Sequence, residues 1–400
     1  MTQVPGSWRR AAAEARLLGV NGEVAPTIFA EMSGLASRTG AINLGQGFPD
    51  EDGPAEVLEA ARQAISDGWN QYSPGRGVPE LLDAIAEHQM RFYGLEWDPS
   101  TEILVTAGAT EALTSTLLAL LEPGDEVVVF EPFYDSYAAA IGLAGARLVP
   151  VRLRWPDFQP DLDELASAVT GRTRVILVND PHNPTGAMFS PETQRLVVEL
   201  AERHDAIIVT DEVYEHLAFG HPHSPISALP GARSRTVSIS SGGKTFRTTG
   251  WKIGWLTAPA DLVTAIVTVK QYLTYVNGSP FQPAIAAGLR LSDDFFDGVR
   301  EDMRTKSAVL GAGLEAAGFA VSHPSGTYFT IADAATLGWD DAVDFCRALP
   351  RLAGVVGIPV SAFVTAEHDA DYRSLVRFAA CKRLSVVEEA AERLGGLSAR

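Results

Sequence analysis

The sequence predicts an α/β fold, with a large domain built on a mostly parallel, seven-stranded sheet between helices and a smaller α+β domain. Between about residues 100 and 260, short apolar runs alternate with helical segments. Several runs are continuous Val, Ile and Leu, such as Val-Ile-Leu-Val at 175–178 and Ile-Ile-Val at 207–209. Uninterrupted apolar runs are typical of strands that helices cover on both faces. Their alternation with helices is the pattern of a doubly wound domain.

The seven strands are expected at residues 102–106, 126–130, 147–153, 174–179, 206–210, 236–240 and 254–258. A short turn joins the last two, so we expect the final strand to run antiparallel. One helix is expected at 110–121, where Pro123-Gly124 stops it. Another is expected at 190–203, because Ser190 is a good N-cap and Pro191 suits the first turn.

The C-terminal part of the chain has a different pattern. Residues 285–318 are helical in character, and strands are expected at 320–321, 328–331 and 375–379 among further helices. We therefore predict that residues 1–45 form an N-terminal arm and part of the small domain. Residues 46–285 would form the large domain, and residues 286–400 the small C-terminal domain.

Composition excludes several classes of function. Apolar residues make up 46% of the 400 residues and charged residues 20%, which is typical of a globular protein. A formal net charge of −18 argues against nucleic acid or an anionic membrane as a partner. The two cysteines and eight histidines show no metal-binding spacing, so no metal is expected. The N-terminus has no signal-peptide core and no run could span a bilayer, so a cytoplasmic location is expected.

Polar and glycine-rich segments follow four of the predicted strands at their carboxyl ends. They are Gly108-Ala109-Thr110, 179–183, 211–214 and 240–244. Because an open α/β sheet binds its ligand at this edge, we expect the four segments to form one site.

Lys244 is the most informative residue of this group. The chain has only five lysines against 27 arginines, and Lys244 and Lys252 flank one glycine-containing turn. A lysine can act as a neutral amine and form a Schiff base with an aldehyde, whereas an arginine cannot. The alternative is that both lysines lie on the surface of a loop.

Neighbouring residues offer complementary chemistry, each with a simpler alternative. Asp211 could cap a helix, or it could pair with a protonated pyridine nitrogen. Asn183 could shape a turn, or it could donate a hydrogen bond to a phenolate oxygen, and Tyr214 could do the same. Gly108-Ala109-Thr110 opens a helix whose N-terminus could bind phosphate, with Lys252 nearby.

Together these segments resemble the class I/II pyridoxal-phosphate-dependent aminotransferases of fold type I. The resemblance extends from about residue 25 to 383 and depends on six motifs in order. They are Asn-Leu-Gly-Gln-Gly-Phe-Pro-Asp at 43–50, Asn-Gln-Tyr at 70–72, Pro-His-Asn-Pro-Thr-Gly at 181–186, Asp-Glu-Val-Tyr-Glu at 211–215, Ser-Gly-Gly-Lys-Thr-Phe at 241–246 and Leu-Val-Arg-Phe at 375–378. The sequence looks most like the kynurenine/glutamine/methionine aminotransferases and the actinobacterial N-succinyldiaminopimelate aminotransferases.

The resemblance implies a role for each matching residue. Lys244 would hold pyridoxal phosphate as a Schiff base and move the substrate proton. The cofactor would be bound by Ala109, Thr110, Tyr134, Asn183, Asp211, Tyr214, Ser241, Lys252 and, from the partner subunit of a homodimer, Tyr72. The substrate would be bound by Gly47, Asn183 and Arg377, with Arg377 gripping the α-carboxylate as a bidentate fork.

Three positions depart from the family pattern. Asp180 precedes Pro-His-Asn-Pro, where relatives usually have Ser or Thr, and Arg247 follows Lys-Thr-Phe, where Ser, Asn or His is commoner. These opposite charges could pair with each other. Thr27 lies near a position that is aromatic in the kynurenine enzymes, which argues against aromatic substrates.

The expected function is therefore amino-group transfer between an L-amino acid and a 2-oxo acid by a ping-pong mechanism. The donor would be N-succinyldiaminopimelate, glutamine, methionine or kynurenine. One alternative is a β-lyase, oxidase or cyclase, which would use the same cofactor motifs. Another is a ligand-sensing regulator, against which the negative charge and the lack of a DNA-binding segment before Asn43 both argue.

Overall fold

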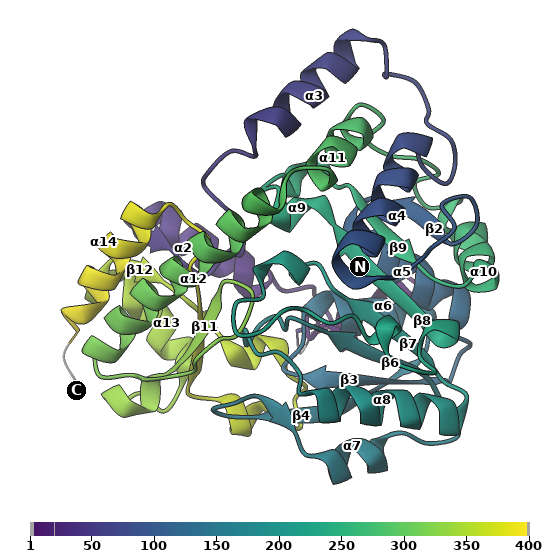
Figure 1. Cartoon of the computed structure of the whole chain (residues 1–400). Coiled ribbons are helices and arrows are strands. Elements are labelled where there is room, and N and C mark those ends of the chain that lie inside the picture. The colour runs from purple at the N-terminus through teal and green to yellow at the C-terminus, as the bar shows by residue number, and fades with distance from the viewer. Residues whose placement is uncertain (1–3, 20, 398–400) are drawn as a thin grey trace.

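The computed structural model describes residues 4–19 and 21–397. Residues 1–3, 20 and 398–400, which belong to the predicted arm and the predicted C-terminal domain, lie outside the described residues. Figure 1 shows a large sheet with helices on both sides, next to a smaller assembly of strands and helices that contains the C-terminus.

All seven predicted strands lie in one sheet, in the order β2-β9-β8-β7-β6-β3-β4-β5. Strand β9 is antiparallel to both of its neighbours, as the short turn before it indicated. The added strand β5 has two residues and pairs antiparallel with β4, so it is too short to leave an apolar pattern. The bounds are β2 (Ile103–Thr106), β3 (Glu126–Glu131), β4 (Arg147–Arg154), β5 (Gln159–Pro160), β6 (Thr173–Asn179), β7 (Ile207–Asp211), β8 (Thr236–Ser241) and β9 (Gly254–Thr257).

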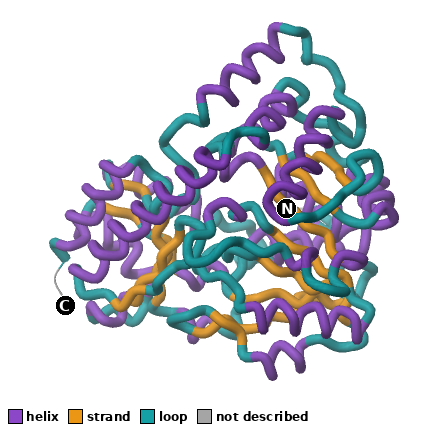
Figure 2. The backbone as a smooth tube through the Cα atoms, viewed as in Figure 1, coloured by secondary structure: helices purple, strands orange, loops and turns teal. Residues whose placement is uncertain are grey.

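Alternate residues of the central strands face two separate cores. Val175 and Leu177 pack against α5 (Gly108–Leu120), α6 (Asp135–Ala144) and α10 (Ala260–Lys270). Ile176 and Val178 face the opposite way, toward α7 (Leu162–Ala168) and α8 (Pro191–His204). Both faces of these strands are therefore apolar, and the helices cover the sheet as two layers (Figures 1 and 2).

The predicted starts and stops of two helices agree with their local chemistry. Ser190 caps α8, because its side chain accepts a hydrogen bond from the backbone N–H of Thr193 at 3.1 Å. Helix α5 ends at Leu120, just before the Pro123-Gly124 turn. At the β2–β9 end of the sheet, one further core joins α3 (Ala55–Ser66), α4 (Pro79–Tyr93) and α11 (Phe281–Leu289).

The smaller assembly has a four-stranded antiparallel sheet in the order β10-β11-β14-β13. Residues before 45 contribute to its core, because Met32, Ala36 and Leu44 pack with residues beyond 300. Strand β1 also pairs with β12. The bounds are α2 (Ile28–Thr39), β1 (Ile42–Asn43), α12 (Asp293–Ala316), β10 (Ala320–Val321), β11 (Phe329–Asp333), α13 (Ala342–Ala353), β12 (Val355–Val356), β13 (Ile358–Pro359), β14 (Leu375–Ala379) and α14 (Leu384–Gly395).

Helix α1 (Trp8–Glu14) packs on α6 of the large sheet. The early residues thus contact both assemblies, whereas the exact domain boundaries at 45 and 285 remain a prediction. Among the described helices, none has the length and apolar character that crossing a bilayer requires.

Candidate active site

One cavity of about 450 Å³ lies at the carboxyl ends of the strands. Segments after β2, β6, β7 and β8 reach it, as expected for an open α/β sheet. Every predicted site residue except Tyr72 lines it, namely Gly47, Ala109, Thr110, Tyr134, Asn183, Asp211, Tyr214, Ser241, Lys244, Lys252 and Arg377. Residues that are up to 330 positions apart in the sequence therefore meet at one place, as the motif order implied.

Lys244 lies in the short helix α9 (Gly242–Thr245), directly after β8. Its Nζ donates a hydrogen bond to the carbonyl oxygen of Gly47 at 3.3 Å, and Tyr328 donates its hydroxyl to the same oxygen at 2.5 Å. Burial lowers the pKa of the Lys244 amine, because the charged form loses solvation. A lowered pKa increases the neutral fraction, which is the form that attacks an aldehyde.

Asp211 is the last residue of β7 and is largely buried. One carboxylate oxygen accepts a hydrogen bond from the Tyr137 hydroxyl at 2.6 Å. Burial raises the pKa of this carboxyl, and both the Tyr137 hydrogen bond and the charge of Lys244 oppose that rise. The site thus offers a buried carboxylate that can pair with a cationic ring nitrogen.

The N-terminus of α5 forms the end of the cavity that suits an anion. The N-cap residue, Ala107, offers no side-chain cap, so the first-turn N–H groups of Gly108, Ala109 and Thr110, which line the cavity, are available to a ligand. Lys252 has a left-handed backbone, with φ of 55°, and its Nζ lies 3.5 Å from the Thr110 hydroxyl. Gly108 also has a left-handed φ of 72°, and a Cβ there would lie 3.3 Å from Nζ of Lys252. The close approach of these groups explains the glycine.

Arg377 is in the middle of β14 with only 2% of its surface exposed. It donates to the Asn183 side-chain oxygen at 2.9 Å and to the Gly45 carbonyl at 2.8 Å. The rings of Phe329 and Phe363 lie 4.1 and 4.6 Å from its guanidinium carbon. Burial lowers its pKa to about 10, so it remains charged at neutral pH. Its buried Nε has no partner among the described residues.

Tyrosine rings form two walls of the cavity. Tyr134 meets Tyr137 edge-on with centroids 5.7 Å apart, and burial raises the pKa of Tyr134 to about 12. Nζ of Lys244 lies 5.6 Å from the centre of the Tyr214 ring. At Gly47 a Cβ would come within 2.9 Å of the Phe329 ring, so a larger residue there would disturb this wall.

Tyr72 lies apart from this group in the single chain. Its ring is 82% exposed and does not line the cavity. It contacts Tyr275 edge-on, with centroids 5.7 Å apart.

The donor set fits pyridoxal phosphate. The helix N-terminus and Lys252 suit the phosphate, and the Asp211 carboxylate suits a protonated pyridine nitrogen. Lys244 offers an amine of lowered pKa for the aldehyde.

Comparison with known proteins agrees with this donor set. The family model for aminotransferases of class I and II matches residues 39–394. This chain belongs to the class I and II aminotransferases.

Relatives within this family cover nearly the whole chain. A probable N-succinyldiaminopimelate aminotransferase of Mycobacterium tuberculosis is 49% identical over 94% of this chain and 97% of its own. The methionine aminotransferase of Escherichia coli is 39% identical over 93% and 96%, respectively. The solved N-succinyldiaminopimelate aminotransferase of M. tuberculosis superimposes with a TM-score of 0.89 over 93% of this chain and 97% of that chain, at 49% identity. The chain is therefore a pyridoxal-phosphate-dependent aminotransferase of fold type I.

Three residues in or beside the active-site cavity were not predicted from the sequence. Tyr137 bonds to Asp211, Tyr328 bonds to Gly47, and Phe329 lies against Arg377. Tyr137 was discoverable, because it follows Tyr134 by about one helical turn in the segment Glu-Pro-Phe-Tyr-Asp-Ser-Tyr. Phe329 is the first residue of β11 and Tyr328 directly precedes it, and the apolar pattern there predicted a strand but not the direction of its side chains.

The expected pairing of Asp180 with Arg247 is wrong. Asp180 accepts from the Gln194 side chain at 3.0 Å, inside the core behind the cavity. Arg247 instead belongs to a charge ring of Glu51, Arg247, Asp302 and Lys306. Each cation contacts both carboxylates, at 3.4 and 2.9 Å from Arg247 and at 2.9 and 2.8 Å from Lys306. The ring joins the Lys244 loop to α12 and to the segment after Gly47.

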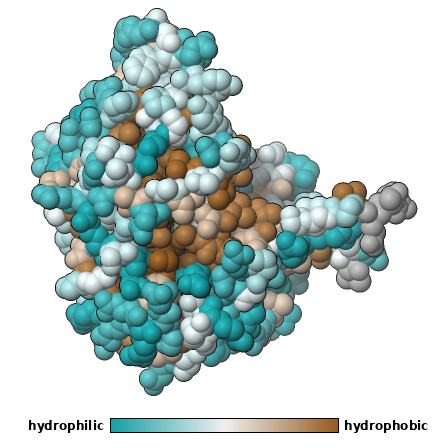
Figure 3. Space-filling view, turned by 90° about the vertical axis from the view of Figure 1, so that its right-hand side faces the viewer, coloured by the Kyte–Doolittle hydropathy of each residue, from teal (hydrophilic) through white to brown (hydrophobic). Residues whose placement is uncertain are grey.

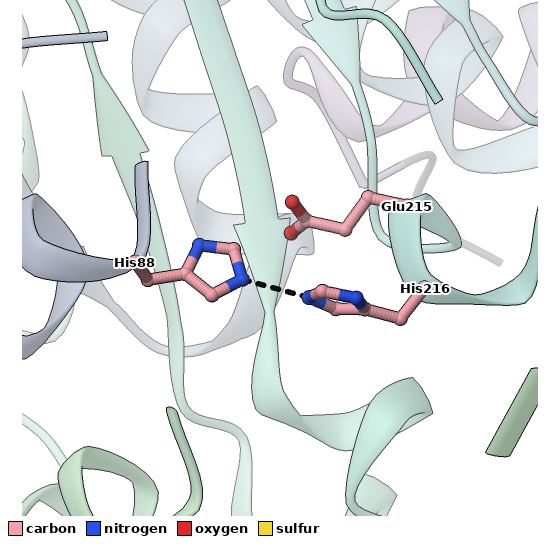
Figure 4. A group of neighbouring side chains, drawn as sticks. All are labelled: His88, Glu215 and His216. Carbon is pink, nitrogen blue, oxygen red and sulfur yellow. Dashed lines mark hydrogen bonds between the residues drawn. The ribbon is translucent and has the colours of Figure 1, made fainter. Parts of the chain in front are cut away.

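The expectation of no metal spacing overlooked one cluster of possible ligands. His88 of α4 lies beside Glu215 and His216, which are adjacent in a short 3-10 helix (Figure 4). The two ring Nε2 atoms are 2.7 Å apart and share a hydrogen bond. Glu215 accepts hydrogen bonds from the hydroxyls of Tyr93 and Ser240. The three residues thus bond to neighbouring protein groups and form a buried polar cluster.

This cluster predicts a pH effect on stability. Burial lowers the pKa of His88 to about 3, against 6.5 ordinarily. Between these values the unfolded chain binds a proton that the folded chain does not, so His88 makes the fold less stable as pH falls below 6.5. In His88→Gln the fall in unfolding free energy between pH 6.5 and 4 should be shallower, by at most about 1.4 kcal/mol per pH unit. Denaturant titrations at several pH values would measure the unfolding free energy.

The control is His323→Gln, because His323 is exposed. An unchanged pH dependence of the unfolding free energy in His88→Gln would contradict the prediction.

Proposed function

We propose that Lys244, Asp211, Asn183 and Arg377 carry out a ping-pong transamination, in which an L-amino acid gives up its amino group and a 2-oxo acid then accepts it. The observation that carries this proposal is their meeting in one cavity, with the amine of Lys244 half-buried and the guanidinium of Arg377 buried. The relatives named above are aminotransferases, which favours this reaction over the β-lyase and oxidase alternatives.

Lys244 is the residue that moves the proton at the substrate α-carbon. Bound pyridoxal phosphate supplies an electron sink that stabilises negative charge at that carbon. The amine of Lys244 is suited to the transfer because burial lowers its pKa below that of an ordinary lysine. Its contact with the Gly47 carbonyl holds Nζ at the cavity wall. Asp211, oriented by Tyr137, would pair with the cofactor's ring nitrogen and favour its protonated form.

The remaining predicted residues orient the cofactor. Asn183 and Tyr214 would hold the phenolate oxygen of the cofactor, and Tyr134 would lie against its ring. Ala109, Thr110, Ser241 and Lys252, at the α5 N-terminus, would hold its phosphate. Support for these roles comes from the shared cavity and from the position of Lys252 beside Thr110.

Arg377 binds the substrate α-carboxylate in this proposal, close to Gly47 and Asn183. The guanidinium is preorganised, because two hydrogen bonds and two aromatic rings fix its orientation. Its unpartnered Nε is one donor that faces no protein acceptor among the described residues.

Replacing Arg377 with alanine should raise KM for amino acid donors far more than it lowers kcat. Loss of hydrogen bonds to a charged group costs roughly 1.5–3 kcal/mol, so kcat/KM should fall about 10- to 150-fold. Steady-state kinetics with L-methionine would measure it, and Arg347→Ala, an exposed ion-pair arginine on α13, is the matched control. An unchanged KM would show that the carboxylate binds elsewhere.

A homodimer is the second part of the proposal, with Tyr72 reaching the phosphate of the partner's site. Exposed aromatic residues support it, since Tyr72 and Tyr272 are 82% and 83% exposed and Tyr275 is 49% exposed. Figure 3 shows apolar residues gathered near the centre of one face of the molecule. Large exposed apolar areas are typical of interaction sites.

The donor is proposed from the relatives. Their names include N-succinyldiaminopimelate and methionine aminotransferases, and both chains are covered almost completely. We also place the enzyme in the cytoplasm, in keeping with two free, buried thiols at Cys346 and Cys381.

A single-turnover absorbance scan tests the proposed function. The holoenzyme would be mixed with each of a panel of amino acids without any acceptor. Conversion of the yellow cofactor to its pyridoxamine form with some of them would establish transamination and identify the donor class. A protein that stays yellow while ammonia and pyruvate accumulate would refute the proposal.

A further inference from the structure

A second cavity, of about 260 Å³, adjoins the active-site cavity. Thr27, Phe29 and Asp135 line both, so the two spaces meet at these side chains. A substrate whose α-carboxylate lies at Arg377 in the first cavity could therefore extend its side chain past Asp135 into the second.

The second cavity has two arginines among its walls. Arg16, after α1, donates to the carbonyls of Ser361 and Val364 at 3.1 and 2.9 Å and to Asp369 at 3.2 Å. These bonds come from Nη1 and Nη2 and fix the guanidinium in place.

Arg373 is anchored differently. Its Nε donates to Asp341 at 3.3 Å, and Asp341 is itself held as the N-cap of α13. Both terminal Nη groups of Arg373 lack a hydrogen-bond partner within residues 4–19 and 21–397. The side chain is thus oriented by one bond and has four N–H donors left for a ligand.

Asp135 lies at the junction of the two cavities. It follows Tyr134 in the first turn of α6, and burial raises its pKa. A half-buried carboxyl at this point is a ready acceptor for an N–H donor on a passing side chain.

Thr27 is a small side chain at the junction of the two cavities. Its side chain is half-buried and caps α2 by accepting from the Ala30 N–H at 3.1 Å. A threonine occupies much less space than an aromatic ring, so the two cavities stay connected here.

We propose that the second cavity is a subsite for an amino donor whose long side chain carries an acylated amine and ends in a carboxylate. Asp135 accepts the amide N–H at the junction, and the unpartnered Nη groups of Arg373 bind the terminal carboxylate. This assignment rests on the proposed function and adds to it the residues that select the amino donor. Arg377 binds the α-carboxylate as before.

Three synthetic donors test the subsite. L-norleucine has a plain aliphatic side chain, N6-acetyl-L-lysine adds the amide, and N6-succinyl-L-lysine adds the amide and the terminal carboxylate. With the holoenzyme, kcat/KM should rise along this series. A succinyl compound that is no better than the acetyl compound would overturn the proposal.

Arginine variants test which residue produces the preference for N6-succinyl-L-lysine. Arg373→Ala should lower the ratio of kcat/KM for N6-succinyl-L-lysine to that for L-methionine about 10-fold, the usual scale for a lost charged hydrogen bond. Arg347→Ala, whose side chain also pairs with one carboxylate but does not line the second cavity, should leave the ratio unchanged. An equal fall for both donors in Arg373→Ala would refute the assigned role.

Two variants of Thr27 test whether the substrate side chain passes through the junction of the two cavities. Thr27→Ala removes the α2 cap without filling space, whereas Thr27→Tyr removes the cap and fills the junction. Only the tyrosine variant should lose selectivity for N6-succinyl-L-lysine. Equal selectivity of the two variants would show that the side chain does not pass through this junction. Pyridoxamine formation from L-methionine reports separately on transamination, so failure of the subsite and failure of the proposed function give different results.

Discussion

Replacing Lys244 with alanine should abolish steady-state transamination, with kcat reduced by at least about 10⁴-fold, the upper end of what a positioned acid–base group contributes. Under the proposed function, the variant loses both the amine for the cofactor aldehyde and the group that moves the α-proton. The absorbance band of the yellow holoenzyme should disappear as well. Stopped-flow and steady-state assays with L-methionine and a 2-oxo acid would measure both effects.

Lys244→Arg separates charge from nucleophilicity. Arginine keeps the positive charge, but it is always protonated and cannot form the Schiff base. It should therefore be as inactive as the alanine variant, while thermal unfolding shows that both variants are folded. Activity retained in Lys244→Arg would mean that this position supplies only charge, and normal turnover in Lys244→Ala would refute its role altogether.

The second large effect is expected at Asp211. Asp211→Asn keeps the shape and can still accept a hydrogen bond from Tyr137, but it removes the negative charge that we propose pairs with the ring nitrogen. The cofactor then stores negative charge poorly, so kcat should fall on the order of 10²- to 10³-fold, as for loss of one electrostatic stabilising group. Steady-state kinetics and a cofactor absorbance spectrum would measure the change.

The neighbouring Glu212 provides the control for Asp211. It is equally buried and follows directly in sequence, but it bonds to Thr210 and His223 and does not line the cavity. Glu212→Gln should keep kcat within a few-fold of the parent enzyme. Similar losses in both variants would show that the effect comes from disturbing β7, and an active Asp211→Asn would exclude the charge pairing.

Much of the sheet and of the cavity could be predicted, because both depend on local pattern. Apolar runs such as 175–178 specify strands, and parallel strands place the residues at their carboxyl ends along one edge. Lys244, Asp211 and Asn183 follow from that geometry and from their motifs. The two-residue β5 left no pattern that could be read.

The partners of individual side chains could not be predicted in the same way. Asp180 and Arg247 were expected to pair because both are charged and near the cofactor strands. The core position of Asp180 and the reach of α12 toward Arg247 are set by tertiary packing, which no spacing in the sequence encodes. The second cavity likewise depends on residues near the N-terminus meeting residues near position 370.

The charge ring limits how this sequence can diverge. Its two cations and two carboxylates sum to zero, and Lys306, only 2% exposed, depends on both carboxylates. Substituting a small residue for Arg247 alone leaves a net charge of −1 around that ammonium group (+1 from Lys306, −2 from Glu51 and Asp302). Because residues that share partners have non-additive effects, we expect homologues that lack the arginine to have lost one of these acids too.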